Sequence, residues 1–455
     1  MNNFTDTLSN WIISLSDAIC GYPEFLLLIG GGLFLFCYSR GVSIRHIPKA
    51  INALRTRQAR SADKPTGQIS SFQALMSAIA ATVGMGNIAG VAIALTVGGP
   101  GVIFWMWVSA LLGMSTKFFE GALSIMYKGR DSNGEIQGGP MYFITGGLGP
   151  RWRWMAVAFS IFGLVGTLCF MQANQLVEAL TTVVTPHIGL TDSLGVRFGL
   201  GVAIALLVAL VILGGIKRIA SVAARVVPTM VVLYMALVVV IIALNINQIP
   251  GVLASIFRGA FSFEAGAGAF FAIALTGARR AAMVNEAGVG TGSMMHGASA
   301  NTDPLVEGRV AMLGPMIDSG LVCTLTAMPI LIAGNYVGLT DPKGLYVALG
   351  AFANLLPYGQ YLLMLIVLFF AFSTMFSYSY YGQKCTSYLF GANRAKYYNY
   401  YYLIMIVVAA VMPLATLVSV MDLAFALMAL CTMVAIFALS PRVVDLLKNE
   451  AKTPQ

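Results

Sequence analysis

Long apolar runs dominate the chain, and short polar stretches separate them. A helix that crosses a membrane needs about 20 mostly apolar residues, and eleven runs of that kind occur between clusters of charge, glycine or proline. They lie at residues 23–39, 72–96, 101–128, 153–180, 196–214, 222–245, 265–285, 308–335, 359–390, 398–415 and 418–440. The pattern predicts an all-α polytopic membrane protein with about eleven transmembrane helices.

Lys and Arg fall almost entirely on one side of these runs. Of the 27 basic residues, 22 lie in segments on the same side as residues 40–66, whereas Arg197, Arg258 and Lys343 lie on the other side. Cytoplasmic loops of membrane proteins are enriched in Lys and Arg. The bias predicts a multi-pass protein of the cell inner (plasma) membrane, with the N-terminus outside and the C-terminus cytoplasmic. It also explains the net charge of +9 without nucleic acid.

The N-terminal region adds two expectations. Residues 1–20 are expected to form a short interfacial helix ahead of the first span. Residues 40–66 are basic, and Ile47, Ile51 and Leu54 recur there at helical spacing. This spacing favours an amphipathic helix on the inner leaflet over a regulatory docking site.

Composition and motifs exclude other classes of protein. The chain is 58% apolar and only 10% charged, against about 25% charged residues in soluble domains. No Walker loop, HExxH or GxSxG motif occurs, and the six Cys and three His (His46, His187 and His296) show no metal-ligand pattern. The sequence therefore predicts neither an enzyme nor a bound cofactor. Eleven spans with glycine-broken helices are typical of a secondary transporter.

The strongest helix break lies in the second run, at residues 80–90 (AATVGMGNIAG). Glycine weakens a helix by about 1 kcal/mol relative to alanine, and unpaired backbone at membrane depth is tolerated only where it lines a cavity or binds something. Freed carbonyls suit a cation, and the N–H groups that start the next half-helix suit a carboxylate. The alternative is close helix packing through small residues, which would not need Asn87.

A second glycine-rich stretch, residues 266–277, opens the seventh run, five runs after the first. If the two broken helices are partners, the chain contains two five-helix repeats that are inverted in the membrane, because each has an odd number of spans. Residues 1–66 then form an N-terminal segment with one span, 67–262 the first repeat, 263–440 the second repeat and 441–455 a cytoplasmic tail.

Several motifs together make the sequence resemble the alanine/glycine:cation symporters (sodium:alanine symporters, amino acid carrier proteins) over about residues 20–440. The motifs are AATVGMGNIAG at 80–90, GGPGVIFWMWVSALLGMSTK at 98–117 with Glu120, GGPMYF at 138–143, MQAN at 171–174, NEAGVG at 285–290, AMLGPMIDSGLVCTLT at 311–326, FST at 372–374 and YSYYG at 378–382. The resemblance implies the leucine-transporter fold, a 5+5 inverted repeat, here preceded by one extra N-terminal span. Residues 280–284 depart from the family pattern.

The resemblance also implies a substrate pocket and a Na⁺ site. The expected substrate-binding residues are Thr82, Gly84, Gly86, Asn87 and Gln172, with Phe271 and Ile273 as apolar walls. The expected Na⁺ ligands are the carbonyls of Ala80, Val83 and Phe370 and the hydroxyls of Ser373 and Thr374. Neutral oxygens suit this hard cation. In the alternative interpretation, the two hydroxyls only hydrogen-bond to carbonyls one turn back.

Other polar residues lie in or beside the runs. Lys117 and Glu120 lie three residues apart, and a structural or gating ion pair near the cytoplasmic end is favoured over a substrate contact. Asp318 is a lone acid that serves either as a proton or cation site or as a satisfied packing carboxylate. Glu286 is expected to cap a helix–loop junction.

These features predict a symporter that imports a small neutral amino acid, alanine or glycine, coupled to Na⁺ by alternating access. Its partners would be the amino acid, Na⁺ and the lipid bilayer. A proton-coupled carrier of the same fold, in which Asp318 or Glu120 titrates, is the first alternative. A non-coupled channel or a scaffold protein is the alternative from another class.

Overall fold

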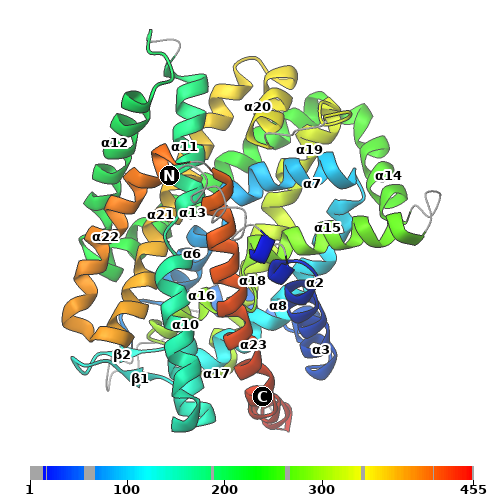
Figure 1. Ribbon diagram of the computed structural model, residues 1–455. Coiled ribbons are helices and arrows are strands. Elements are labelled where there is room, and N and C mark those ends of the chain that lie inside the picture. The colour runs from blue at the N-terminus through cyan, green and yellow to red at the C-terminus, as the bar shows by residue number, and fades with distance from the viewer. Residues whose placement is uncertain are drawn as a thin grey trace.

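The computed structural model describes residues 14–16, 18–55, 67–185, 189–261, 267–339, 344–412 and 414–452. Most of the expected interfacial helix, the end of the basic stretch and His187 lie outside these residues. Helices make up nearly all of the described chain, and many of them run roughly side by side in one bundle (Figure 1).

The expected spans are present as helices. Within the described ranges, eight helices are long and apolar enough to cross a membrane, and the bent pair Ser71–Thr82 and Gly86–Gly98 would make a ninth. The two remaining runs form α15 (Ala267–Asn285) and α22 (Ala392–Val411), each with two basic residues toward one end. The prediction of an all-α polytopic fold is therefore confirmed.

The N-terminal part packs onto the bundle. Its elements are α2 (Tyr22–Phe25), the π-helical turn η1 (Leu26–Gly30), α3 (Gly31–Tyr38), α4 (Val42–Arg45) and α5 (Ile47–Arg55). The first three belong to one helical span, Ser14–Tyr38, which includes the described part of residues 14–20. On α5, Ala50 is buried but Ile51 is 38% exposed, so only part of its apolar face lies against the protein.

Residues 67–261 contain the next five spans and two short strands. The elements are α6 (Ser71–Thr82), η2 (Gly86–Gly90), α7 (Val91–Gly98), α8 (Val102–Met126), β1 (Gly129–Arg130), β2 (Ile136–Gln137), α9 (Pro140–Phe143), η3 (Ile144–Leu148), η4 (Pro150–Trp152), α10 (Arg153–Gly166), α11 (Phe170–Val183), α12 (Leu194–Ile212), α13 (Gly215–Leu244), η6 (Ile246–Gln248) and α14 (Ile249–Ala260). The strands pair antiparallel. α10 and α11 together form one span, Pro150–Val183.

Residues 267–452 contain the last five spans. The elements are α15, α16 (Thr291–Gly297), α17 (Pro304–Ala311), α18 (Leu313–Pro315), η7 (Met316–Val322), α19 (Cys323–Ala333), α20 (Gly344–Leu355), α21 (Gly359–Phe390), α22 and α23 (Leu414–Lys452). α23 continues past residue 441, so the described part of the expected tail is an extension of the last helix.

Both five-span sets begin with an interrupted helix, but the second interruption is not where the sequence suggested. α6 ends at Thr82, and the chain bends by 55° before η2 and α7 continue. α15 runs unbroken through the glycine-rich stretch, and the helix breaks later, where Glu286, Gly288 and Gly290 have φ values of 50°, 96° and 93°. The prediction of a break within residues 266–277 is therefore wrong for the part that is described.

The glycines in that stretch have a packing role instead. A Cβ on Gly277 would overlap the Val102 carbonyl and lie 2.9 Å from Trp105, and α15 packs along α8. Small residues let two helices approach closely. The positive φ angles of Gly288 and Gly290, which glycine adopts most easily, account for the true break.

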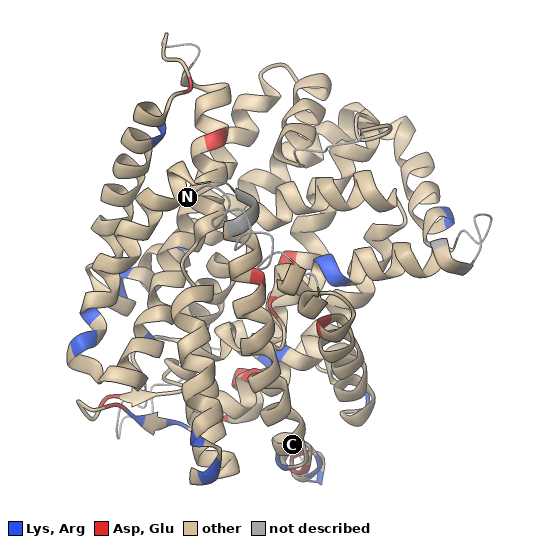
Figure 2. Ribbon diagram, in the orientation of Figure 1, with Lys and Arg blue, Asp and Glu red and all other residues tan. Residues whose placement is uncertain are grey.

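Charged residues are unevenly distributed over the bundle. Figure 2 shows many of the Lys and Arg residues toward the end of the molecule where the C-terminus lies, and few at the opposite end. This distribution is what a protein with one cytoplasmic, basic face would show. The membrane orientation itself stays a prediction.

Cysteine labelling in intact cells tests that orientation. In a Cys37→Ser background, which removes the exposed cysteine among those described, we expect Thr191→Cys to react with a membrane-impermeant maleimide. Arg151→Cys should be protected until the membrane is permeabilised, because its loop lies on the basic side. Both positions are exposed. The opposite labelling pattern would invert the topology.

Candidate functional site

Where α6 ends, the side-chain oxygen of Asn87 replaces a backbone carbonyl as a hydrogen-bond acceptor. The Gly84 N–H donates to Asn87 Oδ1 at 2.9 Å, and the Asn87 N–H donates to the Gly84 carbonyl at 3.1 Å. In a continuous helix these two N–H groups would donate to the carbonyls of Ala80 and Val83, four residues earlier. The break therefore leaves two carbonyls, one turn apart, without their helical donors.

One hydroxyl of α21, that of Thr374, lies at the second of these carbonyls, and Ser373 shares a carbonyl acceptor with it on α21. Ser373 Oγ and Thr374 Oγ1 each donate to the Phe370 carbonyl at 3.0 Å, and Thr374 Oγ1 lies 3.4 Å from the Val83 carbonyl. A Cβ on Gly84 would be 2.6 Å from Thr374 Oγ1, so only glycine allows this approach. Of the expected Na⁺ ligands, Val83, Phe370, Ser373 and Thr374 are thus brought together, and Ala80 lies one turn back on α6.

Both interpretations of the α21 hydroxyls are compatible with this geometry. Each hydroxyl bonds to a carbonyl one turn back, as the alternative requires, yet a donating hydroxyl keeps lone pairs that can face a cation. The residues that carry these oxygens are fully buried, the Met230 sulfur lies 3.7 Å from Ser373 Oγ, and no three His, Cys, Asp or Glu side chains form a metal-binding group within the described residues. The donor set suits a monovalent hard cation better than a transition metal.

Asn87 also connects the α6 break to the eighth expected span. Its Nδ2 donates to the Asp318 carbonyl at 3.3 Å and lies 3.6 Å from Cys323 Sγ. Asp318 is in the π-helical η7 and is 1% exposed, and its Oδ2 has no hydrogen-bond partner among the described residues. Burying an unpartnered carboxylate oxygen is costly. The other oxygen, Oδ1, accepts a hydrogen bond from the Ser319 N–H, so the carboxylate has one paired and one unpaired oxygen.

The expected substrate-binding residues lie on two different helices. Thr82 and Gly86 are half-buried at the α6 break, whereas Gln172 is on α11, where it is 7% exposed and its Oε1 has no partner within the described ranges. α6 and α11 both pack against α21. Gln172 thus offers a buried acceptor on another helix that packs against α21, and among the described residues no direct bond joins it to the break.

The expected apolar walls are not at the break. Phe271 is 68% exposed, and it lies with Ile273 in the first turns of α15, more than two turns ahead of Asn285. One α15 side chain that faces the break is that of Val284, which is 6% exposed and would contact a Cβ on Gly86 at 3.5 Å. We therefore replace Phe271 and Ile273 by Val284 as an α15 residue that faces the break.

A buried ion pair supports the second break. Lys117 Nζ lies 3.4 Å from Glu120 Oε2 and donates to the Glu286 carbonyl at 2.9 Å. Glu120 also accepts hydrogen bonds from the Gly288 N–H and from Ser293 Oγ. The pair predicted from the sequence therefore exists, and it satisfies backbone groups that the break of the α15–α16 helix exposes.

The Glu286 side chain completes this arrangement. Its carboxylate accepts hydrogen bonds from the hydroxyls of Thr291 on α16 and Tyr378 on α21. Glu286 is 2% exposed and has a φ of 50°. It thus lies at the helix–loop junction, as the sequence suggested, and also connects that junction to the helix that carries Ser373 and Thr374.

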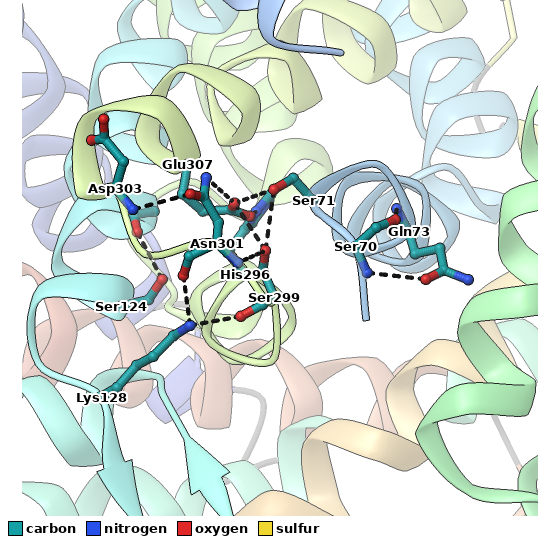
Figure 3. A network of polar contacts seen from close by, with 11 residues as sticks. Ser70, Ser71, Gln73, Ser124, Lys128, His296, Ser299, Asn301, Asp303 and Glu307 are labelled. Carbon is teal, nitrogen blue, oxygen red and sulfur yellow. Dashed lines mark hydrogen bonds and ion pairs between the residues drawn. The ribbon is translucent and has the colours of Figure 1, made fainter. Parts of the chain in front are cut away.

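A second polar network, missed in the sequence, joins the start of α6 to α16 and α17 (Figure 3). Glu307 is fully buried, and its Oε1 lies 2.7 Å from His296 Nδ1. Its Oε2 accepts from Ser71, Ser299 and Asn301 at 2.7 to 3.0 Å. In the sequence His296 belongs to no metal-ligand pattern, and no local motif pairs it with Glu307.

Backbone contacts and a lysine strengthen the same junction. The Ala300 N–H donates to the Ile69 carbonyl at 2.7 Å, and Lys128 Nζ donates to the carbonyls of Ser299 and Asn301 at 2.6 and 2.9 Å (Figure 3). The start of the first broken helix is thereby tied to the loop after the second. Any movement of α6 away from α16 would have to break these contacts.

Comparison with known proteins relates this chain to a family of transporters. A model described as the sodium:alanine symporter family matches residues 5–454. The chain is 37% identical to the sodium/alanine symporter AgcS of Methanococcus maripaludis, covering 96% of this chain and 98% of that protein. It is 32% identical to the probable sodium/glutamine symporter GlnT of Bacillus subtilis, covering 95% and 89%.

A solved structure shares the fold. The crystal structure of MhsT in complex with L-phenylalanine superposes with a TM-score of 0.53 at 13% identity, covering 81% of this chain and 88% of that one. At this identity the likeness concerns the fold alone. It confirms the expected leucine-transporter-like architecture.

Proposed function

The chain belongs to the sodium:alanine symporter family, and we propose on that basis that it imports a small neutral amino acid, alanine or glycine, together with Na⁺. Membership makes it a multi-pass membrane protein of amino acid symport and not an enzyme. Family membership leaves three points to the proposal. They are which amino acid is carried, which ion drives transport, and an inner-membrane location with the N-terminus outside.

The observation that carries the Na⁺ assignment is the meeting of α6 and α21. The Ala80 and Val83 carbonyls lack their helical donors, and Thr374 Oγ1 lies 3.4 Å from one of them. Together with the Phe370 carbonyl and Ser373 Oγ, these atoms make five neutral oxygens from two helices. A cation there would join the two helices, so Na⁺ binding would favour the arrangement in which α6 lies against α21.

The substrate assignment rests on the same break. A zwitterion needs N–H groups for its carboxylate and oxygen acceptors for its ammonium. The N–H and the carbonyl of Gly84 are already paired with Asn87, so the backbone beside it, around Thr82 and Gly86, would have to supply both, and the unpartnered Gln172 Oε1 is a further acceptor. Because Asn87 fixes the break by its bond to Gly84, the substrate and the cation would use one local conformation. This arrangement supports coupling, since each ligand would stabilise what the other needs.

The α15 wall supports a small substrate and gives a prediction. We expect Val284→Phe to lower alanine uptake about tenfold, because a larger side chain against Gly86 overfills the site at a cost of roughly 1–3 kcal/mol. Phe271→Ala should leave uptake within about twofold, since that ring is exposed on the outer part of α15. Initial rates of labelled alanine uptake, normalised to inserted protein, measure both. A large loss of uptake in Phe271→Ala, with none in Val284→Phe, would instead support Phe271 as an apolar wall of the substrate site.

A proton-coupled carrier is the second candidate, and Asp318 is the observation that favours it. Its Oδ2 is buried and unpartnered among the described residues, beside the Asn87 contact. If protons drive transport through this group, Asp318→Asn should abolish acceleration by an inward proton gradient. On the Na⁺ proposal, Asp318→Asn should leave the requirement for Na⁺ in place. Uptake at fixed Na⁺ between pH 6 and 8 separates the two.

Equilibrium binding to purified protein tests the Na⁺–alanine proposal without any gradient. Na⁺ should raise the affinity for labelled alanine, and alanine should raise the affinity for Na⁺ by the same factor, because coupling free energies are reciprocal. Choline and K⁺ at equal ionic strength serve as controls. Alanine affinity that ignores Na⁺ but responds to pH would favour the proton-coupled candidate.

A further inference from the structure

A pocket lies at the basic end of the bundle, apart from the α6 break. Its volume is about 800 Å³, and it is lined by the end of α3, by α4 and α5, and by the last turns of α23. Figure 1 shows the ends of α3 and α23 close to one another there, near the C-terminus. The pocket is thus formed between the extra N-terminal span and the last span.

The lining of this pocket carries excess positive charge. Arg40, Arg45, Lys49 and Lys448 contribute four cations against the single lining carboxylate of Glu450, and Lys448 is also paired with Asp445 at 3.2 Å. The Glu450 carboxylate already contacts Arg309 and lies 3.6 Å from Lys49. Arg40 and Arg45 form no ion pair within the described residues. The pocket therefore offers uncompensated guanidinium groups to an anion.

His46 responds to the same positive field. Burial, followed by the nearby charges of Arg309, Lys49 and Arg45, lowers the pKa of His46 to about 4. Its Nδ1 accepts a hydrogen bond from Arg309 Nε at 3.2 Å, as a neutral imidazole can. At neutral pH, His46 is therefore an uncharged member of the lining, and the positive charge comes from the Arg and Lys side chains.

The rest of the lining is apolar and continues onto the outer surface of the first span. Tyr38, Val42, Val444 and Leu447 line the pocket. Tyr38 stacks on Phe34, which is 50% exposed on α3 one turn back from the pocket. A free phosphate ion would make no favourable contact with this apolar strip, whereas a lipid has a phosphate for the basic residues and acyl chains for the apolar strip.

We propose that the pocket binds the phosphate headgroup of an anionic membrane lipid, with Arg40, Arg45 and Lys49 as phosphate ligands and the α3 surface as the seat of an acyl chain. Basic pockets between transmembrane helices on the cytoplasmic side suit such headgroups. The site would hold the N-terminal span and the end of α23 together through the lipid.

The test compares two variants that lose equal charge. Purified full-length protein is exchanged into detergent with phosphatidylglycerol or phosphatidylcholine, and bound lipid is counted by native mass spectrometry. Arg45→Gln with Lys49→Gln changes the pocket, and Arg151→Gln with Arg153→Gln changes exposed residues in η4 and at the start of α10. Since each basic residue near a headgroup is worth about 1 kcal/mol, or roughly fivefold in affinity, the pocket variant should bind phosphatidylglycerol about 25-fold more weakly. The control variant should bind as the wild type does.

A single variant and a competition experiment test the proposal further. Arg45→Gln alone, which removes no ion pair among the described residues, should still weaken binding about fivefold if the double variant proves unstable. Inorganic phosphate or glycerol phosphate at millimolar concentration should not displace the lipid. Displacement by these soluble anions, equal binding of phosphatidylcholine, or equal losses in pocket and control variants would each overturn the proposal.

Discussion

Replacing Ser373 by Ala and Thr374 by Val should raise the Na⁺ concentration for half-maximal alanine uptake at least about tenfold. The change removes the α21 hydroxyl that reaches the Val83 carbonyl of α6 and the hydroxyl next to it, but it nearly preserves side-chain volume. Interactions with charged groups are worth roughly 1.5–3 kcal/mol each, so even one lost ligand would reach this shift. Initial uptake rates over a Na⁺ titration, with choline as the balancing cation, give the value.

The same helix provides the matched control. Ser379 Oγ and Thr386 Oγ1 donate to carbonyls one turn back, those of Phe376 and Gly382, at 2.8 Å. Ser379→Ala with Thr386→Val therefore removes two hydroxyls of the kind that only support their own helix, and the Na⁺ dependence should stay unchanged. Equal shifts in both double variants would mean that helix bonding, not cation binding, explains Ser373 and Thr374.

Replacing Glu120 by Ala should destabilise the protein and abolish uptake. The substitution leaves Lys117 buried without its carboxylate and removes the acceptor of the Gly288 N–H and of Ser293 Oγ. Breaking a buried ion pair by removing one partner costs about 3–5 kcal/mol. Thermal unfolding of the detergent-purified protein, followed by size-exclusion chromatography, should show a melting temperature several degrees lower than that of the wild type.

A double variant separates charge from shape. Lys117→Met together with Glu120→Ala removes both charges, so it should be less destabilised than the sum of the two single variants. Uptake should remain low in the double variant, because the Glu286 carbonyl and the Gly288 N–H at the second break still lack their partners. Wild-type uptake in the double variant would show that the pair does not position the break.

Much of the architecture could be predicted from the sequence because lipid imposes strong constraints. Within the described residues the apolar runs are helical, with the run at 72–96 divided by a bend, and this first break was readable because Gly84, Gly86 and Asn87 interrupt an otherwise apolar helix at mid-span. The second break was placed wrongly because glycine content alone does not separate close packing from positive φ. Gly277 serves packing, whereas Gly288 and Gly290 need the left-handed backbone.

Contacts between residues that are distant in the sequence explain the site features that the sequence did not predict. Arg280 and Asn285 resemble the polar end of a span, yet Arg280 packs against Gly90, and Lys117 and Glu120 satisfy the backbone beyond Asn285. Val284 could not be chosen over Phe271 without knowing where α15 meets Gly86. The Glu307–His296 contact joins two elements with no local signal, and its significance depends on Ser71, more than 200 residues earlier.

Uptake by proteoliposomes tests the central claim, Na⁺-coupled import of a small amino acid, most directly. Purified protein would be reconstituted and supplied with labelled alanine or glycine while inward gradients of Na⁺, K⁺ and H⁺ are imposed one at a time, with the membrane potential clamped. We expect accumulation above the external concentration only with the Na⁺ gradient, and its collapse when that gradient is dissipated. Accumulation driven by the proton gradient in the absence of Na⁺, or equilibration without accumulation under every gradient, would contradict the account.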